Sequence, residues 1–320
     1  MQTELTNKPP KTLSIEEVLP LFLDEDLAQI MPDIRLYRVD SSGYRYYYQV
    51  GQDEAPIFYL SVTSFTRSVL PESKFLTDWR VRLGKEESEE AARVAASYGT
   101  FLHTCIANFM REGYYDHNET PSILSDYMGF EGIPGRFFGP WMDDLENDVL
   151  AFAAFVAERN VKPLAIEFPV CGLGGLAGMI DLPCQMDWNR ARVTALLDFK
   201  SGRKGFWDDH ALQLTTYKAL WNGLFGGTPY EATHIFNWAP NDWRDKPTYK
   251  LENQTESEME DRFPHYLELF RLSGNRNPSR SFKRMTKTLE LGAPVDGCFE
   301  VMSLTDYVTQ KIQDHARAIS

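Results

Sequence analysis

The sequence predicts an α/β fold in which a mixed β-sheet is flanked by helices. Three observations support it: a helical stretch over residues 74–112, three short apolar runs between residues 163 and 202, and a strand at residues 232–240 after a further helix. The order helix, three strands, helix, strand is typical of such a sheet. With 43% hydrophobic residues, the 320-residue chain can bury a sizeable core.

The bulk composition narrows the class of protein. The N-terminus has no apolar stretch of signal-peptide type and no apolar run is long enough to span a bilayer, so we expect a soluble intracellular protein with no membrane partner. None of the four cysteines forms a CxxC pair, which favours reduced, mostly buried thiols. The net charge of −13 means that any nucleic-acid binding depends on a local basic surface or a bound cation.

The N-terminal third contains two recognisable patterns. Residues 34–50 alternate around Ser-Ser-Gly, which predicts a hairpin within an N-terminal extension over residues 1–60, and residues 55–65 predict a strand that enters a turn. Residues 74–112 begin with acidic side chains and continue with apolar residues at helical spacing, which predicts a helix.

Residues 113–143 carry Gly, Pro and many aromatic residues with little periodicity, which predicts a long loop or an irregular insertion. Two interpretations are equally weighted: an arch over single-stranded DNA, in which bases stack on aromatic rings, or a hydrophobic insertion packed on the body. The candidate DNA contacts in this segment are Tyr114, Tyr115, Arg136, Phe137, Phe138 and Trp141, with Tyr127 and Phe130 as further aromatic residues.

The second half begins with an amphipathic helix at residues 145–160 and the three apolar runs. The polar turn "DWNRAR" joins the second and third runs, so antiparallel pairing is expected. Residues 207–227 form the next predicted helix, with Asp208 or Asp209 as its N-cap. After about residue 250 we expect a polar helical extension, which makes residues 246–320 a C-terminal unit.

Two acid-x-Lys triplets occur in the chain, Glu72-Ser73-Lys74 and Asp198-Phe199-Lys200. Such a triplet occurs by chance, so its context decides. Glu72 lies at a polar helix start, whereas Asp198 and Lys200 end an apolar strand, where the period of two places both side chains on one face and Phe199 in the core.

Asp181 also closes an apolar run, and antiparallel pairing brings it close to Asp198, depending on register. Two neighbouring carboxylates repel each other unless a cation neutralises them, and Mg²⁺ prefers such oxygen ligands. A nearby lysine can then orient an attacking water or help to deprotonate it.

Helices on either side add polar groups to this set. Gln213 and Tyr217 share one helix face, with His210 one turn earlier, and we assign His210 to a capping region rather than to a ligand set. His103 follows Gly99, a small residue that permits close approach to a neighbour.

The ordered set GTxxH, GxxD, DxK and QxxxY resembles the RecB-type branch of the PD-(D/E)XK nuclease superfamily, which includes the lambda-type exonucleases. The set covers residues 99–217. The resemblance implies a restriction-endonuclease-like α/β core over residues 61–245, with helical additions.

The same resemblance implies roles for individual residues. Bound Mg²⁺ or Mn²⁺ would be held by His103, Asp181, Asp198 and the Phe199 carbonyl, with Lys200 acting on the water and Gln213 and Tyr217 holding the site or the phosphate. Glu167 matches a frequently acidic position and ranks lower. Only Cys298 follows the core, so we expect no iron–sulfur cluster of the kind found in some relatives.

A basic stretch between residues 271 and 287 contains no acid, which favours either a phosphate-binding surface or a solvated face. The candidate DNA contacts are Arg203, Lys204, Arg271, Arg276, Arg280, Lys283, Arg284 and Lys287.

These features together predict a metal-dependent deoxyribonuclease, an exonuclease acting on DNA ends or single strands. Two alternatives stay open: a nucleic-acid-binding or assembly protein that keeps the fold without catalysis, and a structure-selective endonuclease. A recombination partner protein and an oligomer are both compatible with the sequence.

Overall fold

The computed structural model describes residues 21–31, 36–41, 44–50, 56–203 and 205–273. It also describes short pieces near the two ends of the chain, at residues 5–6, 16–18, 34, 281–285, 299–303, 305–307, 309–310 and 314. Among these residues, no helix combines the length and the apolar character that crossing a membrane requires.

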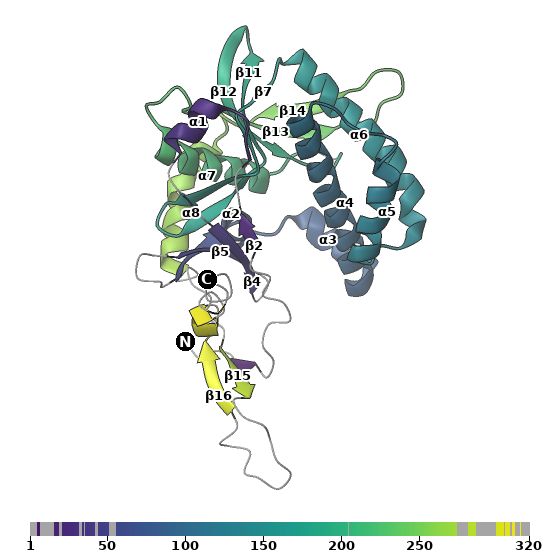
Figure 1. The fold of residues 1–320 in the computed structure, drawn as a ribbon. Coiled ribbons are helices and arrows are strands. Elements are labelled where there is room, and N and C mark those ends of the chain that lie inside the picture. The colour runs from purple at the N-terminus through teal and green to yellow at the C-terminus, as the bar shows by residue number, and fades with distance from the viewer. Residues whose placement is uncertain are drawn as a thin grey trace.

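A five-stranded mixed sheet forms the centre of the fold (Figure 1), in the order β14-β13-β12-β11-β7. Its strands are β7 (Lys162–Pro163), β11 (Leu182–Trp188), β12 (Ala191–Phe199), β13 (His234–Pro240) and β14 (Tyr249–Asn253). Strands β11 and β12 pair antiparallel through the polar turn, whereas β12 and β13 pair in parallel across a helical connection. The mixed sheet predicted from the order of elements is therefore confirmed.

A second, six-stranded sheet has the order β2-β4-β5-β6-β10-β9. Its strands are β2 (Glu16–Val18), β4 (Leu36–Ser41), β5 (Tyr44–Val50), β6 (Pro56–Ser61), β9 (Phe168–Gly172) and β10 (Leu176–Ile180). The pairing of β4 with β5 confirms the predicted hairpin. Strand β10 leads through Asp181 directly into β11, so this one residue lies where the chain passes from one sheet to the other.

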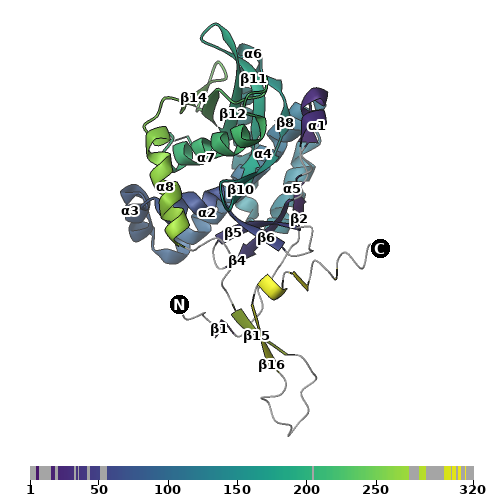
Figure 2. The same ribbon diagram turned by 90° about the vertical axis from the view of Figure 1, so that its left-hand side faces the viewer.

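Helices cover both faces of the central sheet (Figures 1 and 2). They are α1 (Glu25–Ile30), α2 (Val62–Val69), α3 (Lys74–Leu83), α4 (Lys85–Glu112), α5 (Thr120–Glu131), the 3-10 turn η1 (Gly135–Phe137), α6 (Phe138–Glu158), α7 (Asp208–Phe225) and α8 (Met259–Ser273). Phe152 of α6 packs edge-on against Phe199 and Trp238, with ring centroids 5.2 Å apart in both pairs. On the opposite face, Leu214 and Trp221 of α7 pack with Leu196 and other buried strand residues.

Two small sheets complete the described structure. Strands β3 (Leu21–Phe22) and β8 (Ala165–Ile166) pair antiparallel, and β1 (Leu5–Thr6), β15 (Ser281–Met285) and β16 (Phe299–Ser303) form a sheet below the main body (Figure 1). The region after residue 250 therefore contains strands β14, β15 and β16 besides α8, and the expectation of an all-helical extension is wrong.

The prediction of a loop at residues 113–143 is also wrong, because α5, η1 and the start of α6 occupy most of this segment. Its Pro and Gly residues lie at helix ends rather than in a loop. Pro121 lies in the first turn of α5, where no intrahelical N–H bond is lost, and Gly132 ends the helix with a left-handed φ of 64°.

Three further boundaries differ from the expectation. The predicted helix at 74–112 is two helices, because Gly84 has a φ of +83° that breaks the helical path. Residues after β6 form α2 instead of a turn, and Ser61 caps that helix by accepting the N–H of Ser64 at 3.0 Å. Helix α7 begins at Asp208 with Trp207 at its N-cap, so neither Asp208 nor Asp209 is the cap.

Two glycines allow close packing, one of α7 on β10 and the other of α4 on the loop after β12. A Cβ on Gly178 of β10 would lie 2.7 Å from Cε1 of Tyr217, and a Cβ on Gly99 of α4 would lie 3.1 Å from Oγ of Ser201. The Tyr217 ring is rigid and buried, so it has little room to move away.

Replacing Gly178 by Ala therefore tests the close packing of α7 on β10. We expect Gly178→Ala to lower the free energy of unfolding by about 1–3 kcal/mol, the usual cost of overpacking, measured by urea denaturation. Gly223→Ala is the matched control, because Gly223 lies in α7 with open space around it. This variant should be stabilised by about 1 kcal/mol, since alanine has the higher helix propensity. Unfolding of Gly178→Ala at the wild-type urea concentration would contradict the close packing.

Candidate active site

The strand register decides which carboxylates meet. Leu182 pairs with Leu197, so Asp181, just before β11, lies beside Asp198, near the end of β12. The Asp181 carboxylate accepts the backbone N–H of Phe199 at 2.7 Å, which ties the two strand ends together. The predicted convergence of Asp181 and Asp198 is confirmed.

Three side chains hold the carboxylate of Asp198, which is only 2% exposed. Lys200 Nζ lies 2.8 Å from Oδ2, Gln213 Nε2 donates to Oδ1 at 2.9 Å, and Asn237 Nδ2 donates to Oδ2 at 2.8 Å. Burial nevertheless raises the pKa of Asp198 to about 6, with the charge of Asp181 adding to the increase and Lys200 opposing it.

Lys200 is bonded on two sides, to Asp198 and to Oε1 of Gln213 at 3.2 Å. Burial alone would lower the pKa of Lys200, but the Asp198 carboxylate outweighs burial and raises that pKa above its ordinary value. Lys200 therefore stays an ammonium group at neutral pH, which donates hydrogen bonds and positive charge.

Asn237 is a site residue that the sequence patterns did not reveal. It is fully buried on β13, and the parallel pairing of Asp198 with Asn237 places the two side chains together. Its Oδ1 accepts from Gln254 Nε2 at 3.2 Å, so Asn237 is fixed on its other side. The one available signal was a polar side chain inside the apolar strand "HIFNWAP".

His103 of α4 approaches from the opposite side of β12. Its Nε2 lies 3.0 Å from the Phe199 carbonyl oxygen and its Nδ1 lies 3.6 Å from Oδ1 of Asp181. Burial would lower the pKa of His103, but the Asp181 carboxylate outweighs burial and raises it. In turn, burial would raise the pKa of Asp181, and the interaction with His103 lowers it.

Glu167 lies on the same side, in the step between β8 and β9. It has a φ of +49°, a left-handed conformation that is strained for a residue with a side chain, and its backbone N–H donates to the Asp181 carbonyl at 3.0 Å. Burial, together with the charge of Asp181, raises the pKa of Glu167. Backbone strain of this kind is often found at functional sites.

A small hollow of about 10 Å³ lies between these groups, lined by His103, Glu167, Asp181 and Phe199 with apolar neighbours. This is about the room that one water molecule needs. Asp198 is not among the residues that line the hollow, and its carboxylate is bonded to Lys200, Gln213 and Asn237.

The chemistry of the hollow fits a cation. Both nitrogens of His103 face acceptor oxygens, so a neutral ring with one proton satisfies only one of them. A second proton or a bound metal ion removes the mismatch, and two carboxylates with a carbonyl are the ligands that hard divalent cations prefer. Within the described residues, no three His, Cys, Asp or Glu side chains are spaced to ligate one ion.

Helix α7 supports the site from one face. Tyr217 is buried against Gly178 and interacts with Gln213, so Gln213 is held between Tyr217 and Lys200. His210 Nδ1 accepts the N–H of Trp207 at 3.3 Å, which confirms its predicted capping role. Burial, with the adjacent charge of Lys200, lowers the pKa of His210 to about 4, so this ring is neutral.

Arg203 lies just after the site strand and is bound to acids. It contacts Asp148 at 2.6 Å, Asp144 at 3.3 Å and Asp242 at 2.8 Å, and Asp148 also accepts from Tyr98 at 2.7 Å. Because three carboxylates contact it, Arg203 holds the loop after Lys200 in place, and its assignment as a possible DNA contact stays a prediction. Lys204 lies outside the described residues.

The aromatic residues of segment 113–143 have divided roles. Trp141 is 5% exposed and packs edge-on against Tyr98 at 5.4 Å, so it cannot stack on a base, and its assignment as a DNA contact is wrong. Tyr115, Phe137 and Phe138 also pack against the core, which favours the packed insertion. Tyr114 is 63% exposed.

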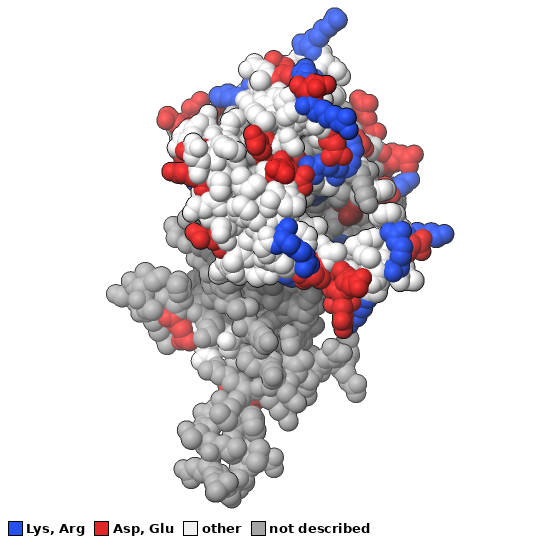
Figure 3. All heavy atoms as spheres, turned by 90° about the vertical axis from the view of Figure 1, so that its right-hand side faces the viewer, with Lys and Arg blue, Asp and Glu red and all other residues white. Residues whose placement is uncertain are grey.

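The predicted basic surfaces are only partly described. Arg136 lies over the Phe137 ring at 4.9 Å, and exposed Arg271 pairs with Glu268 at 3.5 Å. The side chains of Arg276, Arg280, Lys283, Arg284 and Lys287 lie outside the described residues. On the face shown in Figure 3, basic and acidic side chains of the described residues are interspersed.

Comparison with known proteins identifies the family of this arrangement. A model of the PD-(D/E)XK nuclease superfamily matches residues 66–287, which is more than half of the chain and includes every residue of the site described above. None of the curated proteins matches the sequence.

The pH dependence of stability tests the burial of Asp148 beside Arg203. Burial raises the pKa of Asp148 to about 6, although Tyr98 and Arg203 oppose the increase. Between pH 4 and 6, Asp148 therefore keeps its proton in the folded state, whereas it has lost it in the unfolded state. The free energy of unfolding falls as the pH rises through this window, by on the order of 3 kcal/mol in total.

We expect Asp148→Asn to remove this contribution. Urea unfolding of wild type and Asp148→Asn at pH 4, 5, 6 and 7 should show the wild type losing stability relative to the variant as pH rises. Parallel pH profiles for the two proteins would contradict the assignment.

Proposed function

Because the chain belongs to the PD-(D/E)XK nuclease superfamily, we propose that it is a Mg²⁺- or Mn²⁺-dependent deoxyribonuclease that hydrolyses phosphodiester bonds, acting as an exonuclease on DNA ends or single strands. The observation that carries the proposal is the three-way hold on Asp198 by Lys200, Gln213 and Asn237 beside the His103–Asp181 pair. The order of the motifs favours the RecB-type branch.

In this proposal the metal is held by Asp181, the Phe199 carbonyl, Asp198 and His103, with Glu167 as a further oxygen donor. When bound, a divalent ion supplies charge stabilisation at the scissile phosphate and promotes ionisation of water. Of these ligands, His103 would contribute least to metal binding, because its raised pKa favours the protonated ring, which must lose a proton before it can bind a cation.

Lys200 acts as a donor. An ammonium group cannot accept a proton, so we assign Lys200 to orienting the attacking water and to stabilising negative charge on the phosphate. Gln213 and Asn237 keep the Asp198 carboxylate and the Lys200 ammonium in a fixed relation, and Tyr217 keeps Gln213 in place. Fixed donors of this kind need no reorganisation during the reaction.

The alternative is a nucleic-acid-binding protein without catalysis. The complete buried network around Asp198 argues against this alternative. Burying charges has a desolvation cost, and a chain that had lost catalysis would gain nothing from it. A structure-selective endonuclease uses the same chemistry and differs in the substrate that reaches the site.

Removing either member of the Asp198–Lys200 pair should abolish cleavage. For Asp198→Ala and Lys200→Ala we expect the rate on end-labelled single-stranded DNA with Mg²⁺ or Mn²⁺ to fall by about 100-fold or more, because charge stabilisation at the phosphate is lost. Asp187→Ala is the control, since Asp187 lies near the opposite end of β11 and is 53% exposed. Normal cleavage by Asp198→Ala or Lys200→Ala would sink the assignment, and a circular single strand separates exonuclease from endonuclease action.

Calorimetric titration with Mn²⁺ tests the cation site without relying on activity. We expect wild type to bind Mn²⁺ and Asp181→Asn to bind it about 10-fold or more weakly, because the hollow loses a carboxylate. Asp187→Asn should bind Mn²⁺ as wild type does. Wild type that takes up no Mn²⁺ would favour the protein without catalysis.

A further inference from the structure

A second hollow lies close to the site, between the N-terminal end of α7, the end of β14 and the start of α8. We call it the Trp207 pocket, after the side chain on its α7 side, and its volume is about 250 Å³. Gln254 connects the pocket to the site, because this pocket residue donates to Asn237 at 3.2 Å and Asn237 donates to Asp198 at 2.8 Å. The pocket is therefore two hydrogen bonds away from the Asp198 carboxylate.

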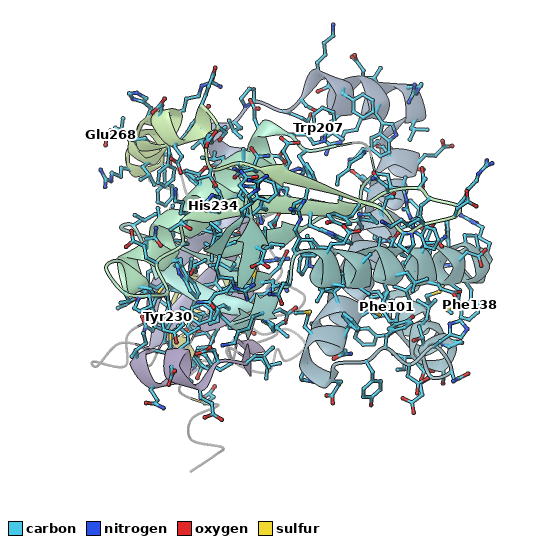
Figure 4. The ribbon with its side chains drawn as sticks, turned by 90° about the horizontal axis from the view of Figure 1, so that it is seen from above. Phe101, Phe138, Trp207, Tyr230, His234 and Glu268 are labelled. Carbon is cyan, nitrogen blue, oxygen red and sulfur yellow. The ribbon has the colours of Figure 1, made fainter. Side chains whose placement is uncertain are left out.

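One wall of the pocket is an accessible aromatic ring. Trp207 is 52% exposed, and Figure 4 shows it at the edge of the body beside α3. Phe75 of α3, also 52% exposed, is nearly parallel to it, with an interplanar angle of 14° and ring centroids 6.5 Å apart. Half-exposed parallel aromatic rings at the mouth of a polar pocket are suited to stacking on another planar ring.

The remaining walls carry hydrogen-bonding groups. Ser257 lines the pocket, and its Oγ is buried in the wall without a hydrogen-bond partner among the residues that the structure describes. Gln254 is only 5% exposed, and its amide is oriented by Asn237 and by Glu252 at 3.0 Å. The polar groups are thus held in place before a ligand arrives.

The charge of the pocket decides which part of a nucleotide enters it. Asp208, Glu252 and Glu258 supply three carboxylates, whereas Arg262 supplies one positive charge and is paired with Glu258. This net negative lining repels a phosphate group. A neutral ring with an amino group is favoured, because an amino group donates hydrogen bonds to carboxylate and hydroxyl oxygens.

We propose that the Trp207 pocket binds one unpaired base of the substrate strand, stacked on Trp207, with an amino group on the base edge donating to Glu252. The inference rests on the proposed nuclease function and adds a substrate class to it. The bound base must be out of its pair, so the substrate is single-stranded at this point. Cytosine, adenine and guanine each carry an exocyclic amino group that satisfies the pocket, whereas thymine has none.

Equilibrium binding without added divalent metal tests the pocket apart from cleavage. With full-length protein and fluorescent 12-nucleotide strands, we expect oligo-dC to bind more tightly than oligo-dT. Trp207→Ala should weaken oligo-dC binding by about 10-fold, the effect of losing one stacked base. Glu252→Gln should reduce the difference between oligo-dC and oligo-dT, and it provides a second readout if Trp207→Ala fails to fold.

Phe130→Ala is the matched control, because Phe130 is an aromatic residue of α5 that is 88% exposed and has no place in the pocket. It should bind both strands as wild type does. Equal binding of the two strands by wild type, or unchanged binding by Trp207→Ala and Glu252→Gln, overturns the assignment of a base to the pocket. If the protein still cleaves DNA in that case, the nuclease assignment stands. Base-dependent binding without any cleavage supports the base-binding pocket and overturns the nuclease assignment. If neither base-dependent binding nor cleavage is observed, both assignments are overturned.

Discussion

The buried carboxylate of Asp198 is the constraint on which the site depends. A charge that is 2% exposed is stable only when donors surround it, and here each donor comes from a different part of the chain. Lys200 follows on the same strand, Gln213 comes from α7, and Asn237 comes from the parallel neighbour β13. The hydrogen bonds of this one carboxylate thus join β12 to its neighbour β13 and to α7.

The other side of β12 has the opposite balance. Asp181, Glu167 and the Phe199 carbonyl supply oxygens, while His103 is the one side chain of the hollow, among the described residues, that can carry a positive charge. The contrast gives the two halves different roles. The Asp198 half holds Lys200 in position through its own hydrogen bonds, whereas the Asp181 half has more acceptor oxygens than donors facing them. Gly99 and Gly178 let α4 and α7 approach closely enough to build both halves.

Much of the fold followed from local patterns, and the errors have identifiable causes. The β4–β5 hairpin, the β11–β12 pair and the helix at α7 obey periodicities that neighbouring residues set. The composition of segment 113–143 predicts a loop where helices form, because Pro and Gly mark helix ends as well as loops. Aromatic composition does not distinguish a core residue from a stacking platform, so it does not reveal that Trp141 is buried.

The sequence by itself determined that Asp198 and Lys200 share a face, that Phe199 turns into the core and that Gln213 and Tyr217 lie together, because these relations depend only on strand and helix periods. Tertiary structure alone decided that Asn237 holds Asp198, that Glu167 adopts a strained backbone beside Asp181, that three acids contact Arg203, and that Trp207 lines a pocket. The reason is physical: each of these contacts joins residues far apart in the chain, and strand register and helix docking, which local periodicity does not encode, bring them together.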